Sequence, residues 1–479
     1  MLATNLSKIN PMIILIVNLF LLLLLSPRLS IGLPVDSNRP PDCPDHCQCL
    51  KTSDILADGP EGWQIVCTAI GLTAIPDYNI IQLPRPIYTL DFDFNSITYL
   101  SVFENVSEIR YLDISNNEVA KIEPRAFTSL PNLIILNLSY NQLIELPSSI
   151  FEPLVHLNYL DLRGNRLKYL PVNVFSSQLS LVSLSIGKNF INRLELGLFD
   201  ENLHLETLDL SENQLSFLPV NLLSNNMILK TVDLSANSFD KIPFETLQGI
   251  PSLQTLILDE NPLRKLNHQS FPPLPNLANL SIQHMPFLRS IDEVTFSYLC
   301  SLERITIAHN PMLVSIDPDA FLDMHKSPNC SKLKEINLSN NRLTKLPQYA
   351  LPWCSLDSVD LSENPWQCDC DLRWLRECHH IVLNSKIFGT IRCNQPAELN
   401  QRDFVDIDVD QFTCDSDFIF ETRVQRFLIM IIALIAFFVA GMVIALFIQR
   451  PIIMDWIYGR KKGIGSIYYV KAPIHMTEY

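Results

Sequence analysis

The chain has 479 residues, 47% of them hydrophobic, and its 51 acidic residues outnumber 36 Lys and Arg, giving a formal net charge of −15. A chain of this length and composition can bury a large core. Its negative charge excludes binding to nucleic acid through bulk charge. Twelve cysteines, together with Asn-x-Ser sequons, indicate an oxidising, secretory route.

Residues 1–32 predict a secretory signal peptide. Lys8 precedes the apolar run of residues 11–25, and the small residues Ser30 and Gly32 follow it, so we expect cleavage after Gly32. The alternative is an uncleaved anchor, but the run is short for a bilayer span.

Residues 33–86 contain a cysteine cluster, formed by Cys43, Cys47, Cys49 and Cys67. We expect this segment to close one end of the repeats that follow, because a terminal repeat exposes its apolar core unless a polar, cross-linked cap covers it. A zinc site made by the first three cysteines and His46 is the alternative. It is disfavoured in a secreted chain, where thiols oxidise.

Residues 87–362 predict about twelve copies of one pattern. From residue 109 to residue 253 an apolar residue opens a new copy every 24 residues. The copy that starts at Leu133 has Leu136, Leu138, Asn141 and Leu143 in the spacing LxxLxLxxNxL. This pattern resembles the leucine-rich repeat. The resemblance implies an α/β solenoid, a horseshoe with a concave parallel β-sheet.

The residues themselves explain such a stack. In one copy Leu160 and Leu162 point to one side of a short strand, while Tyr159, Asp161 and Arg163 point to the other. A single copy cannot bury its leucines, so neighbouring copies must stack and leave the second set exposed on the concave face.

Two further columns recur through the copies. An Asn stands where each strand ends, and we expect its amide to pair with buried backbone groups; in the copy that starts at Leu277, Met285 takes this place. A Phe column is expected to form an aromatic stack, with leucine at two positions, Leu223 and Leu247. The predicted Phe column consists of Phe127, Phe151, Phe175, Phe199, Phe271, Phe296 and Phe321.

The segment 363–414 contains NPWQCDCDLRWLREC, followed by Cys393 and Cys414. It resembles the carboxy-terminal cysteine cap of extracellular leucine-rich repeat proteins, and the cluster at Cys43 resembles their amino-terminal cap. The resemblance implies a short helix over residues 371–379 and four disulfide bonds: Cys43–Cys49, Cys47–Cys67, Cys368–Cys393 and Cys370–Cys414.

Four cysteines remain. Cys300, Cys330 and Cys354 each lie two or three residues before the first leucine of a copy, so successive ones come within bridging distance. We expect Cys300–Cys330 and Cys354–Cys378, whereas a bond between Cys330 and Cys354 is the competing arrangement.

Residues 427–448 are uncharged and apolar, long enough as a helix to span a membrane, and residues 415–426 form a juxtamembrane segment. Basic residues follow the span, so we expect the tail, 449–479, in the cytoplasm and a single-pass type I protein of the plasma membrane. The terminal residues Thr477, Glu478 and Tyr479 resemble a motif bound by PDZ domains, which makes such an adaptor a possible partner.

The candidate ligand-binding residues lie on the concave face: Tyr111, Tyr159, Asp161, Arg163, Asp209 and Asp233. Aromatic and arginine side chains are typical interface anchors. The competing interpretation is that aspartate before Leu-Ser is repeat consensus with no ligand. Five sequons predict glycosylation: Asn105, Asn137, Asn279, Asn329 and Asn337. Three of them point to the concave side, which leaves an open window between Tyr159 and Gln254, where reversal of the aspartate charges should weaken binding.

The sequence contains no GxSxG, HExxH or phosphate-binding loop, so we expect neither an enzyme nor a cofactor. The layout resembles neuronal leucine-rich repeat adhesion receptors without immunoglobulin domains. This implies cell-surface recognition, as an adhesion protein, receptor or co-receptor for extracellular or cell-surface proteins. An auxiliary subunit that modulates a channel or receptor in the same membrane is the alternative.

Overall fold

The computed structural model describes residues 43–51, 62–76, 86–326, 330, 332–378 and 391–458. The predicted signal peptide, Asn329 and the last 21 residues of the predicted tail, 459–479, lie outside these residues. The described chain forms two compact units. One runs up to Leu343 and includes Tyr349–Asn364, and the other consists of Thr344–Gln348 and the residues from Pro365 onward.

The first unit is a solenoid built on a 14-stranded sheet. Two strands come from the segment before the repeats, β1 (Gln48–Lys51) and β2 (Trp63–Val66), and pair antiparallel. The others come one from each repeat and pair in parallel, beginning with β3 on β2. They are β3 (Ile87–Asp91), β5 (Tyr111–Asp113), β7 (Ile135–Asn137), β8 (Tyr159–Asp161), β9 (Ser183–Ser185), β10 (Thr207–Asp209), β11 (Thr231–Asp233), β12 (Thr255–Ile257), β14 (Asn279–Ser281), β16 (Arg304–Thr306), β18 (Glu335–Asn337) and β19 (Ser358–Asp360).

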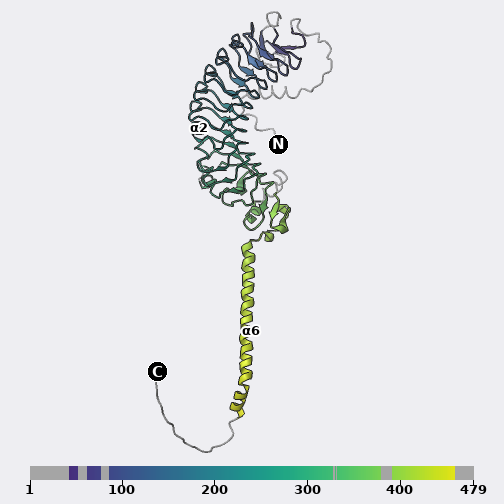
Figure 1. Cartoon of the computed structure of the whole chain (residues 1–479), viewed down its shortest axis with the longest axis vertical. Coiled ribbons are helices and arrows are strands. Elements are labelled where there is room, and N and C mark those ends of the chain that lie inside the picture. Colours follow the sequence, from purple (N-terminus) through teal and green to yellow (C-terminus); the bar gives the residue numbers. More distant parts are fainter. Residues whose placement is uncertain are drawn as a thin grey trace, which may run out of the picture. The chain divides into compact units, whose positions relative to one another are not determined.

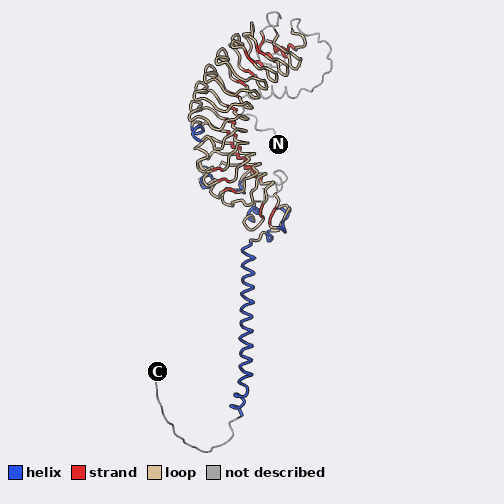
Figure 2. Tube along the Cα trace, viewed as in Figure 1, coloured by secondary structure: helices blue, strands red, loops and turns tan. Residues whose placement is uncertain are grey.

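The strands of this unit line the inner side of its curve (Figure 2). Each repeat strand places its middle residue in the core, as Leu136, Leu160 and Leu184 do in three neighbouring strands. These three leucines are at most 2% exposed, and full burial of a leucine contributes about 1.5–3 kcal/mol. The predicted solenoid with a concave parallel sheet is therefore confirmed.

The Asn column holds the turn that follows each strand. Asn165 donates from Nδ2 to the carbonyl oxygens of Leu138 and Leu162, both at 2.9 Å, and its Oδ1 accepts from the Leu143 N–H at 3.0 Å. The residue before each Asn has a left-handed backbone, for example φ 67° at Gly164. The sharp turn would otherwise leave these buried backbone groups unpaired.

The aromatic column forms two stacks in the described chain. The first runs from Phe103 to Phe199, with ring centroids 6.1–6.3 Å apart between successive repeats. The second joins Phe271, Phe296 and Phe321. Leu223 and Leu247 fill the two positions between the stacks and are fully buried. Phe103 also belongs to the column, although it is not among the predicted positions.

The flank beyond the Asn column changes along the solenoid. Successive repeats from residue 119 to residue 238 are joined by a backbone bond such as Ser238 N–H to the Leu215 oxygen. At the next repeat the donor position is Pro262, which has no N–H. Short strands then take over. They are β13 (Lys265–Leu266), β15 (Ser290–Ile291) and β17 (Ser315–Ile316), and an equivalent pair near the start is β4 (Tyr99–Leu100) with β6 (Lys121–Ile122).

Within the described residues of this unit, short helices stand in three repeats. They are α2 (Phe244–Gln248), α3 (Leu322–Lys326) and the 3-10 helix η3 (Trp353–Ser355). Helix α3 occupies the extra length of the repeat that starts at Leu302.

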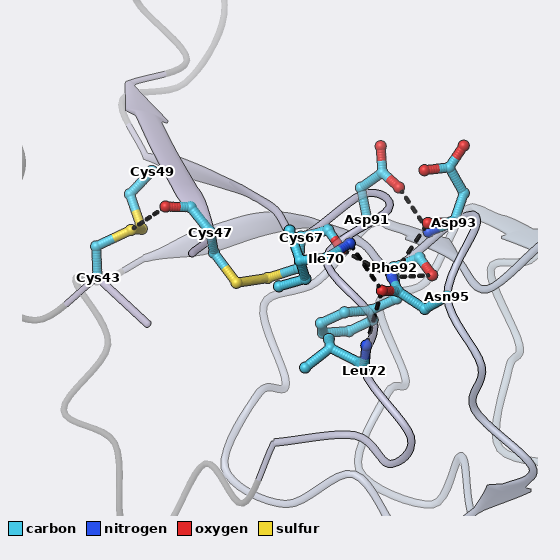
Figure 3. Close-up of a disulfide and its surroundings, with 10 residues drawn as sticks. All are labelled: Cys43, Cys47, Cys49, Cys67, Ile70, Leu72, Asp91, Phe92, Asp93 and Asn95. Carbon is cyan, nitrogen blue, oxygen red and sulfur yellow. Dashed lines mark hydrogen bonds between the residues drawn. A yellow bond between two sulfur atoms is a disulfide. The ribbon is translucent and has the colours of Figure 1, made fainter. Parts of the chain in front are cut away.

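Disulfide bonds join the predicted partners at the start of the solenoid. Cys43 is bonded to Cys49 and Cys47 to Cys67, beside the first Asn of the column, Asn95 (Figure 3). Asn95 donates to the Cys67 oxygen at 2.8 Å and accepts from the N–H groups of Ile70 and Leu72. The first repeat thereby holds the turn of the preceding segment in the way that later repeats hold one another.

Farther along the solenoid Cys300 is bonded to Cys330. Cys354 and Cys378 are disulfide-bonded as well.

The second unit combines a small sheet, 3-10 helices and one long helix (Figure 1). Cys368–Cys393 and Cys370–Cys414 are bonded within it. Where the resemblance implies a helix over residues 371–379, the structure has a 3-10 helix, Arg373–Glu377. The elements are β20 (Trp366–Gln367), β21 (Cys393–Gln395), η4 (Arg373–Glu377), η5 (Ala397–Leu399), η6 (Phe404–Asp406), η7 (Val409–Gln411) and α6 (Asp415–Tyr458).

Helix α6 is 44 residues long, or about 66 Å at 1.5 Å per residue. Its stretch Gln425–Arg450 is long and apolar enough to cross a membrane. The predicted juxtamembrane segment, 415–426, belongs to the same continuous helix.

Candidate ligand-binding surface

A hollow of about 330 Å³ opens on the concave face between β5 and β10. Five of the six predicted residues line it, namely Tyr111, Tyr159, Asp161, Arg163 and Asp209. The sixth, Asp233, lies on the next strand, β11, and does not line the hollow. The structure therefore brings most of the predicted set to one place.

The hollow arises from a change in side-chain size along one row of the sheet. The first residues of successive strands are in register, and the row passes from Tyr111, Ile135 and Tyr159 to Ser183 and Thr207. Two tyrosines and an isoleucine thus stand beside two small hydroxyl side chains. Neighbouring strands are about 4.8 Å apart, so the change from large to small side chains leaves a depression in the sheet surface. The large side chains form its apolar wall.

A second row, formed by the last residues of the same strands, makes the polar wall. Each aspartate in it accepts a hydrogen bond from the backbone N–H two residues later, as Asp161 does from Arg163 at 3.0 Å and Asp209 from Ser211 at 2.9 Å. With this hydrogen bond each aspartate stabilises the turn of its own repeat. The alternative interpretation, that these aspartates are repeat consensus without a ligand, therefore explains one of the two carboxylate oxygens of each aspartate.

The second oxygen of Asp161 and of Asp209 lies beside another polar side chain. Asp209 Oδ2 accepts from Ser185 Oγ at 2.6 Å, and Asp161 Oδ2 lies 2.9 Å from Arg163 Nε. The Arg163 side chain keeps 43% of its surface exposed. A carboxylate and a guanidinium are thus both within reach of a bound partner.

Burial raises the pKa of the Asp161 carboxyl to about 6, even though the charge of Arg163 acts to lower it. Burial also raises the pKa of Asp233 on the next strand, while hydrogen bonds from Ser235 lower it. The polar wall of the hollow therefore loses negative charge as the pH falls through about 6.

At the opposite end the hollow borders a cluster of buried acidic groups. Tyr111 donates from its hydroxyl to Asp113 Oδ2 at 2.9 Å, and Asn137 Nδ2 donates to the same oxygen at 2.9 Å. Burial, and then the charges of Asp93 and Asp113, raise the pKa of Asp91 to about 7. Burial and the nearby carboxylates raise the pKa of Tyr111 as well, so its hydroxyl stays protonated and acts as a donor.

Besides core leucines, the lining includes Ile135, Ser183 and Thr207, which sequence reasoning did not single out. A signal for them was present, because small residues follow bulky ones at the same strand positions. Finding it required comparing side-chain volume between copies rather than looking for a chemical type.

The described sequons differ in their surroundings. Asn137 lines the hollow, and Asn279 and Asn337 lie in strands farther along the same sheet. Asn105 is exposed in a turn with φ 56°. A glycan on Asn137 would therefore stand directly in the hollow, which is open to a partner only where this sequon carries no glycan.

Two other places on the chain have the ligand types or the space of a binding site. Cys370, Asp371 and Cys414 lie close enough for a metal ion, but their two sulfur atoms form a disulfide bond, so no thiolate ligand exists there. A larger hollow of about 780 Å³ lies on the flank between residues 240 and 270. Its rim carries charges of both signs, including Asp240, Lys241 and Glu245.

The fold and its repeats agree with comparisons to known proteins. Residues 107–167 and 228–287 match a family model described as leucine rich repeat, and residues 204–226 match another of that description. Residues 289–365 match the BspA type leucine rich repeat region. These segments of the chain therefore contain leucine-rich repeats, in agreement with the fold.

Individual relatives match over short segments. Chondroadherin of Mus musculus is 48% identical over 44 residues, which are 9% of this chain and 12% of that protein. SLIT and NTRK-like protein 6 of Mus musculus is 32% identical over 73 residues, 15% of this chain and 9% of that protein. The chain thus spans about an eighth or less of the length of these relatives.

A solved structure matches over a much longer stretch. A chain in the octameric complex of Latrophilin 3 (Lec, Olf), Unc5D (Ig, Ig2, TSP1) and FLRT2 (LRR) has a TM-score of 0.55 and 20% identity, covering 78% of this chain and 100% of that chain. A likeness at this identity shows the fold.

Proposed function

We propose that the chain is a cell-surface recognition protein that binds an extracellular protein partner in the concave hollow between β5 and β10. The observation that carries the proposal is the hollow itself, where an aromatic wall and a carboxylate wall meet beside the exposed Arg163. Aromatic and arginine side chains at the centre of a concave surface are frequent energetic anchors of interfaces.

The chemistry of the hollow favours a partner that inserts an apolar or cationic side chain. Tyr111, Ile135 and Tyr159 offer apolar surface, and Asp161 with Asp209 offers negative charge at neutral pH. Complementary charge raises association rates and selects partners. Adhesion and ligand capture by a receptor or co-receptor both use such a contact, and neither requires an enzyme.

The rest of the chain supports a place at the plasma membrane, with the amino end outside the cell. The disulfide bonds are typical of secreted chains, and α6 contains one stretch long and apolar enough to span a bilayer. The predicted cytoplasmic tail with its PDZ-type end follows the apolar stretch of this helix. In the octameric complex named above, the FLRT2 leucine-rich repeat chain is assembled with Latrophilin 3 and Unc5D.

The test is a binding screen on cells that display the full-length chain, using a library of soluble extracellular proteins together with a cell-aggregation assay. Tyr159→Ala and Asp161→Asn should each weaken binding of a captured partner roughly tenfold or more, as expected for anchor residues. Asp360→Asn, at the same strand position in the last repeat, is the matched control and should leave binding unchanged. Equal binding by all three variants would place the contact elsewhere on the chain.

A second candidate, an auxiliary subunit that acts through its span, is favoured by the continuity of α6 from Asp415 to Tyr458. Replacing residues 427–448 by a lipid anchor separates the two functions. Recognition through the hollow would survive this replacement, whereas modulation of a channel or receptor through the span would be lost.

A further inference from the structure

Two histidines occupy the same turn position in consecutive repeats, away from the concave hollow. His284 and His309 have left-handed backbones with φ 53° and 56°. Each donates its N–H to the next repeat, to the oxygens of Ala308 and Ser339 at 3.1 and 3.0 Å. Because the two backbones are so alike, their side chains leave the turn in the same direction.

The two imidazole rings lie face to face. Their centroids are 4.7 Å apart and their planes differ by 6°. Both residues are exposed, and neither ring makes a hydrogen bond or ion pair within the part of the chain that the structure describes. By contrast, a ring nitrogen of His204 lies 2.9 Å from the Leu179 oxygen. The ring nitrogens of His284 and His309 are therefore available to a ligand.

This arrangement suits a divalent transition metal. Zinc binds imidazole nitrogen at about 2.0–2.1 Å, so two nitrogens must approach to roughly 3–4 Å to share one ion. A ring nitrogen binds a metal through a lone pair in the ring plane, so the two parallel rings must first turn toward each other. Both side chains are exposed and their centroids are 4.7 Å apart, so rotation about the side-chain bonds can bring one nitrogen of each ring to a shared ion. Imidazole favours zinc, copper and nickel over calcium and magnesium, which prefer oxygen ligands.

The neighbouring repeat adds negative charge. Glu260 stands at the same turn position one repeat before His284, is exposed, and has the same left-handed backbone with φ 57°. Asn340 follows at that position after His309, with φ 55° and an amide side chain. A cation at the histidine pair is thus placed between a carboxylate and an amide rather than between basic residues.

We propose that His284 and His309 together bind one Zn²⁺ ion on the surface of the solenoid. Both imidazoles are neutral when they bind, so any proton held by the pair is released on metal binding. Two protein ligands leave coordination positions open to water or to a side chain of a partner.

The test is calorimetric titration of the full-length chain in detergent micelles with ZnCl₂ at pH 7.5. His284→Ala and His309→Ala should each lower the affinity of one site roughly tenfold or more, about 1.4 kcal/mol per factor of ten. His204→Ala is the matched control and should bind as the parent does. Electron paramagnetic resonance of the same chain loaded with Cu²⁺ should show two coordinated nitrogens, and one in either single variant.

The outcomes that overturn the proposal are distinct. Unchanged zinc affinity in the doubly substituted chain would mean that the ion binds elsewhere. A fall in stoichiometry with unchanged affinity in each single variant would mean that the histidines bind separate ions. Both side chains are exposed, so we expect neither substitution to prevent folding. Display of each variant at the cell surface verifies that it folds.

Discussion

Replacing Asn165 by alanine tests whether the Asn column stabilises the solenoid. This side chain is 5% exposed and makes hydrogen bonds to the backbone of Leu138, Leu143 and Leu162. A hydrogen bond contributes about 1 kcal/mol net, and a buried group left unpaired costs about 1–3 kcal/mol. Asn165→Ala should therefore lower the local free energy of unfolding by roughly 3–5 kcal/mol.

Hydrogen exchange of the full-length chain in detergent micelles measures this loss repeat by repeat. Protection should fall most in the repeats between residues 138 and 166, and least in distant repeats such as that of β16. The matched control is Gln142→Ala in the preceding turn. Only the backbone N–H of Gln142 joins the ladder, to the Val119 oxygen, so its truncation should cost less than about 0.5 kcal/mol. Equal losses in the two variants would refute the assigned role of the column.

Other predictions concern the aromatic column, the acidic cluster and the bound metal. Phe175→Ala removes the fully buried ring between Phe151 and Phe199, and should lower the unfolding free energy by about 3–5 kcal/mol in the same exchange experiment. Asp91 is 5% exposed and its pKa is raised to about 7, so its stabilising contribution is complete below about pH 4 and is lost as the pH rises through 7. Asp91→Asn should therefore raise the free energy of unfolding at pH 8 by at most about 4 kcal/mol, which a higher thermal midpoint would report. Near pH 4 the same substitution should leave the midpoint unchanged. A stabilisation of equal size at both pH values would contradict this. If the histidine pair holds zinc, a chelator should lower the thermal midpoint of the zinc-loaded parent chain and have no effect on that of His284→Ala.

The repeat architecture was predictable because the 24-residue period reports directly on strand spacing. Aliphatic residues recur in every regular copy at the positions of Leu160 and Leu162, and stacking of the copies buries both. Phe103 lies 24 residues before Phe127, so the same spacing marks it; it was left out because the regular copies were counted only from residue 109.

The candidate surface was predictable only in part. Strand alternation places Tyr159 and Asp161 on the concave face, but the hollow depends on the contrast between their volume and that of Ser183. The facing rings of His284 and His309 depend on side-chain rotamers, which a repeat pattern does not specify. Helix α6 already begins at Asp415, whereas hydropathy marks only its apolar stretch.

Stability in a stacked array passes from each repeat to the next through the interface that they share. Between Lys241 and Lys265, three of the features that join successive repeats are interrupted at the same interface. Pro262 supplies no flank hydrogen bond, β13 is the edge of a new sheet, and Leu247 separates the two aromatic stacks. We expect this junction to uncouple first under load or heat, so that the array melts as two cooperative segments instead of one.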